Sequence, residues 1–259
     1  MNEQVWVGAG AQVRAPLDQV TQGSCPPVVL EARGLGKQFN TGSRVLEAVD
    51  FSARRGERIA LVGSNGAGKS TLLRCLVGLL PFGDGTVEIL GQRFSEQPNR
   101  RQRAALRRRL GFVFQFHGLV GRTSALSNVV NGALGQGYGW RAWSQALAPK
   151  QLRADALDAL AAVGLSDRAL DRTDTLSGGQ SQRVAVARAL VHRPELVIAD
   201  EPAASLDPVA GAEVMRVFHG LAEQRGATLV FTTHDLQHAL DYSDRVVGLA
   251  AGRVVLDSP

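Results

Sequence analysis

The sequence predicts an α/β fold with a mostly parallel core sheet, and three observations indicate it. Short apolar runs typical of buried parallel strands recur along the chain. Segments with apolar residues at helical spacing separate them, as the connections of a parallel sheet require. The 259 residues, 44% of them apolar, can bury a sizeable core. We therefore expect one domain with a helical part rather than two full domains.

The strand pattern begins at Val28, after a tail at residues 1–27 that is rich in Gly, Gln and Pro and that we expect to be poorly ordered. Residues 45–51 alternate apolar and polar side chains, which predicts an antiparallel strand. A helix is expected at 151–163, ended by Gly164. The core sheet is expected from five apolar runs, at residues 59–62, 110–114, 196–199, 228–232 and 246–249.

A Gly-rich stretch follows the first core strand and fits the phosphate-binding pattern GxxxxGK[ST]. Helical spacing of apolar residues over 70–80 gives the strand, loop and helix context that this motif needs. The glycines allow a tight turn with inward N–H groups, Lys69 can reach the β- and γ-phosphates, and the Ser70 hydroxyl can ligate Mg²⁺. We predict an ATP site formed by Gly63, Ser64, Asn65, Gly66, Ala67, Gly68, Lys69, Ser70 and Thr71.

Two adjacent carboxylates, Asp200 and Glu201, follow the expected strand at 196–199. Open α/β sheets bind ligands at the carboxyl ends of their strands. We predict that Asp200 holds Mg²⁺ through water and that Glu201 is the general base that orients and polarises the attacking water. The alternative is that Asp-Glu-Pro is only the N-cap region of a helix.

A third motif, Leu176-Ser177-Gly178-Gly179-Gln180, precedes an apolar helical run at 184–190. With this motif the chain resembles the nucleotide-binding subunit of ABC transporters over about residues 28–259. The resemblance implies the phosphate-loop ABC ATPase fold, in which the mostly parallel core sheet is joined by an antiparallel β subdomain and an inserted helical subdomain, here at about 116–190.

Further family motifs fall in sequence order. Phe39 lies where the family places an aromatic residue that stacks on adenine, and Gln115 resembles the glutamine that senses the γ-phosphate and Mg²⁺. Asp207 ends a Ser-Leu-Asp segment that resembles the D-loop, and His234 resembles the switch histidine. Taken alone, Gln115 could be a polar loop residue, and His234 an ordinary surface or capping histidine.

A second anion site is expected where Ser177, Gly178, Gly179 and Gln180 begin a helix, because backbone N–H groups, a hydroxyl and the helix dipole meet there. In the family this site faces the γ-phosphate held by the other subunit of a head-to-tail homodimer. The resemblance thus implies an integral membrane permease as partner and, indirectly, a periplasmic or surface substrate-binding protein. The implied location is the cytoplasmic face of the membrane, and no apolar run approaches the roughly 18 residues of a membrane span.

Within the family the chain is most similar to the ATPase subunit of phosphonate importers. The similarity lies in residues 118–122, 128–135 and 201–208 and in the pair Trp140-Arg141, which implies import of phosphonates or related reduced-phosphorus anions. One departure is Phe-His-Gly after Gln115, where those importers more often have Phe-Asn. Residues 138–143 could also be only a packed aromatic corner.

Other functions remain open from the motifs alone. An ABC exporter shares every catalytic motif and differs in its permease, and a soluble ABC ATPase, such as one in cluster assembly, needs no permease. Six of the ten residues at 100–109 are arginines, and the formal net charge is +5. Because no aromatic residues are interleaved for base stacking, we expect a solvated helix face and no nucleic-acid partner. Cys25 and Cys75 are isolated and predict neither a disulfide nor a metal site.

Overall fold

The computed structural model describes residues 25–39, 42–115, 117–204 and 206–259. Most of the tail expected at 1–27 lies outside the described residues, as do Phe116, which opens the expected helical subdomain, and Ser205 of the expected D-loop. Within the described ranges we find no helix with both the length and the apolar character that crossing a bilayer requires.

A six-stranded sheet forms the centre of the molecule, in the order β10-β9-β3-β8-β7-β6. All neighbours are parallel except β9 and β10. The predicted core strands are all present, and their predicted first and last residues differ from the observed ones by at most one residue. The parallel core is confirmed. The strands are β3 (Arg58–Val62), β6 (Leu110–Val113), β7 (Leu196–Ala199), β8 (Thr228–Thr233), β9 (Arg245–Ala250) and β10 (Arg253–Ser258).

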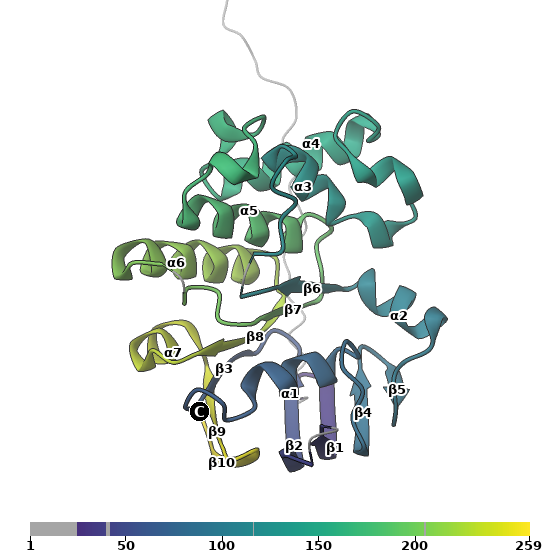
Figure 1. Ribbon diagram of the computed structural model, residues 1–259, viewed down its shortest axis with the longest axis vertical. Helices are drawn as coiled ribbons and strands as arrows, with labels where there is room; N and C mark the ends of the chain where they lie inside the picture. The colour runs from purple at the N-terminus through teal and green to yellow at the C-terminus, as the bar shows by residue number, and fades with distance from the viewer. Residues whose placement is uncertain (1–24, 40–41, 116, 205) are drawn as a thin grey trace, which may run out of the picture.

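An antiparallel sheet in the order β2-β1-β4-β5 lies below this centre in Figure 1, and the expected strand at 45–51 is the middle of β2. Against it packs α1 (Lys69–Leu76), which is shorter than the helix expected at 70–80. The chain leaves the helix early because Gly78 has a left-handed φ of +70°. The strands are β1 (Val28–Gln38), β2 (Arg44–Arg54), β4 (Asp84–Ile89) and β5 (Gln92–Phe94).

Helices cover the other side of the core sheet; most of them form the upper half of Figure 1, and the last one lies lower, near β3 and β8. Between β6 and β7 the described residues form three α-helices and four 3₁₀ helices, and α6 and α7 flank β8. The α-helices are α3 (Ala125–Asn131), α4 (Lys150–Ala162), α5 (Gly178–Leu190), α6 (Pro208–Gln224) and α7 (Leu236–Tyr242). The 3₁₀ helices are η1 (Leu134–Gln136), η2 (Gly139–Trp143), η3 (Ser166–Arg168) and η4 (Thr173–Thr175).

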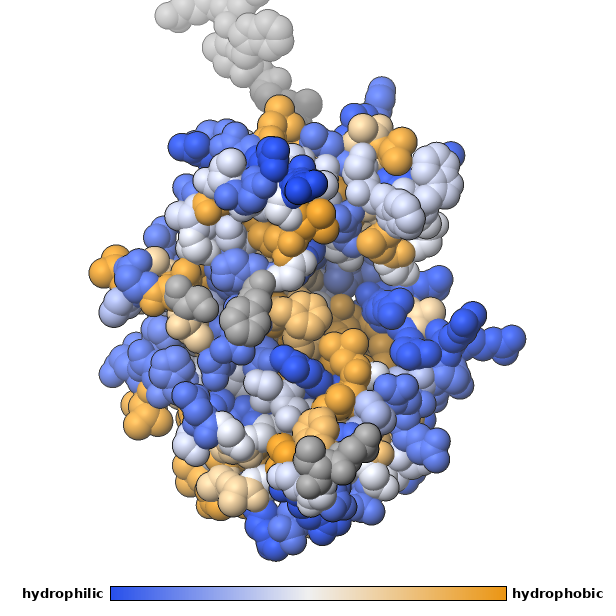
Figure 2. All heavy atoms as spheres, in the orientation of Figure 1, coloured by the Kyte–Doolittle hydropathy of each residue, from blue (hydrophilic) through white to orange (hydrophobic). Residues whose placement is uncertain are grey.

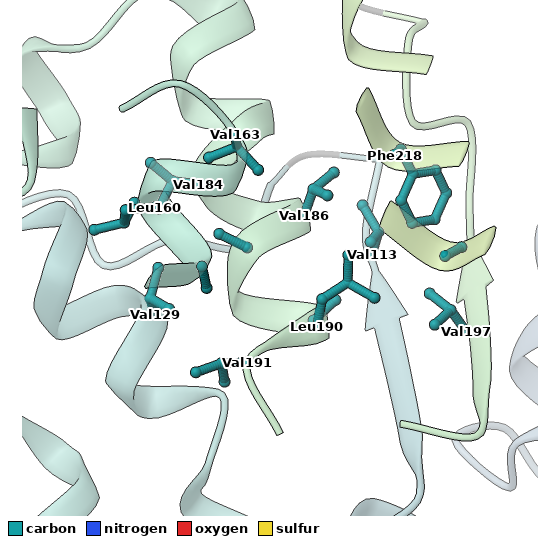
Figure 3. Packing of buried hydrophobic residues seen from close by; sticks show 14 of the residues in the cluster. Val113, Val129, Leu160, Val163, Val184, Val186, Leu190, Val191, Val197 and Phe218 are labelled. Carbon is teal, nitrogen blue, oxygen red and sulfur yellow. The ribbon is translucent and has the colours of Figure 1, made fainter. Parts of the chain in front are cut away.

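The centre of the helical layer is α5, which packs on α3, α4, α6 and β6. Figure 3 shows its side chains Val184 and Leu190 directed to different sides of a shared apolar cluster. The approach of α3 is so close that a Cβ on Gly132 would lie 2.1 Å from the carbonyl oxygen of Arg188. A second cluster lies between the two sheets and α1 and contains Cys75, whose thiol pKa burial raises to about 11.

The arginine-rich segment forms α2 (Arg100–Arg107), whose arginines are exposed or half-buried, as a solvated helix face predicts. Arg109 lies beyond the helix, is half-buried, and pairs with Glu195 through contacts of 2.6 and 2.9 Å. The alternative that residues 138–143 form a packed aromatic corner is wrong for the two tryptophans, because Trp140 and Trp143 are 63% and 68% exposed.

Candidate functional site

The Gly-rich loop connects β3 to α1 and wraps around one ammonium group. Lys69 is the first residue of α1, and its Nζ donates to the carbonyl oxygens of Gly63 (2.8 Å) and Ser64 (3.2 Å). Gly63 is required because a Cβ there would lie 2.2 Å from the carbonyl oxygen of Leu249. Gly68 precedes the helix at a φ of +105°, which a side chain would strain. The loop therefore holds a cation at the start of a helix.

The other predicted loop residues line up along the same turn. Ser64, Asn65 and Gly66 form its exposed tip, Ala67 is buried, and Thr71 lies half-buried on the first turn of α1.

Directly after β7, the carboxylate of Asp200 is completely buried and receives three hydrogen bonds. Its Oδ1 accepts from the hydroxyls of Ser70 (2.7 Å) and Thr232 (3.2 Å). Its Oδ2 lies 3.4 Å from the guanidinium of Arg74. Ser70 and Arg74 are four residues apart, so they share one face of α1 and each approaches a different carboxylate oxygen. These contacts stabilise a buried negative charge beside the loop.

Glu201 points toward the loop from a left-handed backbone with a φ of +48°. Its Oε1 lies 3.8 Å from the Nζ of Lys69, and its Oε2 accepts from the side-chain amide of Gln115 at 3.1 Å. The structure thus brings together three predicted residues from three separate segments. The alternative of a helix N-cap at Asp200-Glu201 is wrong, because the next helix is α6, and its N-cap is Asp207.

The loop after Gln115 is tied to α5. His117 and Gly118 both have left-handed backbones, with φ of +60° and +57°. The guanidinium of Arg188 donates to the carbonyl oxygens of both, at 2.6 and 2.5 Å. Burial lowers the pKa of Arg188, and burial together with that guanidinium lowers the pKa of His117. A groove beside this loop is lined by Phe112, Phe114, Val120, Leu134 and others, and Figure 2 shows apolar atoms gathered near the centre of the face drawn there.

The Ser-Gly-Gly-Gln motif begins α5, as expected. The Ser177 hydroxyl accepts from the backbone N–H of Gln180 at 3.3 Å, and the Gln180 side chain accepts in return from the N–H of Ser177 at 2.9 Å. Gly178 and Gly179 face Leu206 and the start of α6. Among the described residues, no hydrogen bond connects this motif to the Gly-rich loop of the same chain.

A cleft beside Glu201 contains two more predicted residues, His234 and Asp207. His234 is exposed, and the helix that follows it is capped by Asp235, so the capping alternative for His234 is wrong. The carboxylate of Asp207 accepts from the N–H of Ala210 at 3.0 Å.

Phe39 lies apart from these groups, at the end of β1. It is 40% exposed, and the Nζ of Lys37 lies 4.9 Å from the centre of its ring.

Three contact residues were missed from the sequence. Arg74 could have been found, because its spacing from Ser70 places both on one helix face. Thr232 shows only as a polar residue in an apolar strand, and Arg188 gives no local signal because its contacts lie 70 residues earlier.

Comparisons with known proteins agree on one family. Residues 46–204 match the family described as ABC transporter. The phosphate-import ATP-binding protein PhnC of Mycolicibacterium smegmatis is 47% identical over 90% of this chain and 87% of that protein. The phosphonates import ATP-binding protein PhnC of Nocardia farcinica is 46% identical over 90% and 85%. The hypophosphite import ATP-binding protein HtxD of Stutzerimonas stutzeri is 41% identical over 89% and 67%. A dimeric bacterial ABC transporter cassette superposes with a TM-score of 0.77 at 30% identity, over 88% of this chain and 97% of that one.

Proposed function

This chain belongs to the ABC transporter family of ATP-binding proteins, and from that premise we propose that it is the ATP-hydrolysing, energy-coupling subunit of a membrane importer. The observation that carries the proposal is that four side chains lie close together at the start of α1, those of Lys69, Asp200, Glu201 and Gln115. A cation, a buried carboxylate, a second carboxylate and an amide are the groups that phosphoryl transfer to water requires.

In this proposal ATP lies along the Gly-rich loop, with its γ-phosphate near Lys69 and its adenine on Phe39. The contacts of Lys69 with the Gly63 and Ser64 carbonyls are then exchanged for phosphate oxygens. Glu201 is close enough to Lys69 to reach a water beside that phosphate. As the water oxygen bonds to phosphorus, Glu201 takes its proton and the bond to the ADP oxygen breaks, giving ADP and phosphate.

The site also fits a magnesium ion. Mg²⁺ prefers oxygen donors, keeps several waters and uses one or two protein ligands together with substrate phosphates. The Ser70 hydroxyl and the Asp200 carboxylate, 2.7 Å apart, offer such donors, and we propose that they hold the ion together with Gln115. When bound, it neutralises the charge that develops on the phosphates.

We further propose that two copies enclose two ATP molecules head to tail. The exposed start of α5 offers backbone N–H groups and the Ser177 hydroxyl. Ser177, Gly178, Gly179, Gln180 and the neighbouring Asp207 would contact the nucleotide of the partner. Support comes from the likeness to cassettes solved as dimers, one of them a post-hydrolysis state bound to ADP and phosphate.

The substrate that we propose is a phosphonate or a related reduced-phosphorus anion. The relatives are named for import of phosphonates, hypophosphite or phosphate, which are all phosphorus oxyanions. Phosphate import is the second candidate, favoured by the name of the M. smegmatis relative. Such anions need a dedicated importer because moving their charge into hydrocarbon is very costly.

The remaining parts of the assembly are an integral permease, which we place at the groove beside Phe114, and an indirectly coupled substrate-binding protein. The protein is then peripheral, on the cytoplasmic face of the membrane. We assign the ATPase domain to residues 28–259 and its helical subdomain to about 116–190, where α3, α4 and α5 lie.

Growth of a deletion strain tests the substrate. Loss of the gene should abolish growth on a phosphonate as sole phosphorus source and leave growth on phosphate unchanged. The intact gene should restore growth on the phosphonate, whereas a Glu201→Gln copy should not. Growth lost only on limiting phosphate would select the second candidate. Unimpaired phosphonate uptake, with no second such importer present, would contradict the phosphonate assignment.

The same strain separates the remaining alternatives. Co-purification of a tagged chain with an integral permease excludes a soluble cluster-assembly ATPase. The direction of substrate movement in membrane vesicles separates import from export.

A further inference from the structure

The hydroxyl of Thr232 contacts both carboxylate residues of the site through one oxygen atom. We infer that Thr232 is a positioning residue for hydrolysis, which holds Asp200 and Glu201 in their places. The inference rests on the proposed ATPase function and deepens it by naming a residue that acts through the two carboxylate residues. Thr232 itself is completely buried.

The register of the sheet places this hydroxyl where it can act. Strands β7 and β8 are parallel neighbours, and Ala199 pairs with Phe231, so the next residues of the two strands, Asp200 and Thr232, lie side by side. The Thr232 Oγ1 donates to Oδ1 of Asp200 at 3.2 Å and accepts from the backbone N–H of Glu201 at 2.7 Å. A hydroxyl has one proton to donate and lone pairs to accept, so both bonds can form at once.

The bond to Glu201 matters because the backbone there is strained. A φ of +48° is uncommon for a residue with a side chain, and such a conformation persists only where its surroundings hold it. The N–H of Asp200 still bonds to the carbonyl of Val113 in the neighbouring strand, but the N–H of Glu201 bonds to Thr232. The left-handed turn is what directs the Glu201 carboxylate back to Lys69 and Gln115.

Removing the hydroxyl should therefore disturb the general base more than the nucleotide site. Lys69 and Ser70 keep their contacts with the loop and with Asp200, so ATP should still bind. The left-handed turn at Glu201 would lose its hydrogen bond, and the carboxylate would no longer be fixed relative to the attacking water. An interaction lost in the transition state lowers kcat and leaves KM almost unchanged.

The test is Thr232→Val, which has nearly the same shape and lacks only the hydroxyl. We expect kcat to fall by about ten-fold or more, with the affinity for a non-hydrolysable ATP analogue within about two-fold of the parent. Thr232→Ser keeps the hydroxyl and should restore most of the activity. If the valine methyl beside the buried carboxylate prevents folding, Thr232→Ala removes the hydroxyl without adding that methyl.

A matched control lies on the same strand. Thr228 is also completely buried, and its hydroxyl accepts from the N–H of Gly56 at 2.9 Å and bonds to the carbonyl of Arg54 at 3.4 Å, at the opposite end of β8. Thr228→Val should lower the melting temperature about as much as Thr232→Val does, but it should leave kcat unchanged.

The outcomes separate the inference from the function on which it rests. An active parent with an equally active Thr232→Val protein overturns the role of Thr232 alone. The inference is also overturned if kcat falls as much in Thr228→Val as in Thr232→Val, because the loss then follows stability alone. Failure of Thr232→Ser to recover activity overturns it as well, because the hydroxyl is then not what matters. A parent without ATPase activity overturns the proposed function and this inference together.

Discussion

Replacing Glu201 by glutamine should separate ATP binding from ATP hydrolysis. The glutamine keeps the size of the side chain, and its amide oxygen can still accept from Gln115, 3.1 Å away in the parent. It cannot accept the proton of the attacking water at neutral pH. Every group of the Gly-rich loop stays in place, so the nucleotide site survives the change.

The size of the effect follows from what the carboxylate does. Losing a general base lowers a rate by about 10²- to 10⁴-fold, which corresponds to about 3 to 5 kcal/mol of activation free energy. In the free protein, the 3.8 Å pair with Lys69 has a Coulomb energy of about 4 kcal/mol at most, taking an effective dielectric constant of about 20. Since Lys69 keeps two carbonyl acceptors, we expect the free energy of unfolding to fall by less than the roughly 3 to 5 kcal/mol that breaking a buried ion pair commonly costs.

Phosphate release and equilibrium binding measure the two parts separately. Glu201→Gln should bind ATP at least as tightly as the parent, because a negative charge near the γ-phosphate has been removed, while phosphate release becomes almost undetectable. Turnover at the parental rate would refute the assignment of Glu201 as general base. Loss of both binding and turnover would show instead that Glu201 supports the loop.

Three further perturbations test other parts of the site and the fold. Lys69→Ala should lose ATP binding by about ten-fold or more, because it removes the cation at the loop, and calorimetric titration with ATP measures this. Glu201→Gln with ATP should elute as a dimer in size-exclusion chromatography with light scattering, and adding Ser177→Arg should return it to a monomer; monomers in both cases would contradict the enclosed-nucleotide dimer. The Arg58 guanidinium lowers the pKa of Asp244, so this pair stabilises the fold above the ordinary aspartate pKa of about 4, and that stability is lost as the pH falls through the lower folded-state value. Asp244→Asn should thus cost about 1 kcal/mol at pH 7 and progressively less as the pH falls below the ordinary aspartate pKa, as urea unfolding at a series of pH values can check.

Local signals account for the parts of the fold and site that the sequence predicted. The strand, loop and helix around Lys69 follow one another along the chain, and Asp200 follows a run of four buried residues, so neighbouring residues already determine these placements. The sequence prediction extended α1 too far, because the apolar spacing continues past Gly78, where the backbone turns. The sequence pattern alone did not reveal that a single glycine would end the helix there.

Contacts between distant segments account for what was missed. Arg109 belongs to an arginine-rich run, and its ion pair was missed because Glu195, the partner of its guanidinium, lies 86 residues later. Thr232 is one of two threonines in a row, and only the pairing of β8 with β7 distinguishes the one that bonds to Asp200. The roles of Ser177 and Asp207 at a partner's nucleotide stay predictions, since they concern a second copy of the chain.

The tie between Arg188 and the loop after Gln115 has a thermodynamic consequence for a transporter. The same helix, α5, carries Ser177 at its start and Arg188 near its end. If the loop meets the permease and Ser177 meets the partner's nucleotide, the two binding equilibria share one rigid element and are linked. Linkage is reciprocal, so a permease conformation that tightens ATP binding must itself be favoured by ATP to the same extent. The permease conformation and the nucleotide occupancy then influence each other, without any residue that contacts both the permease and the nucleotide.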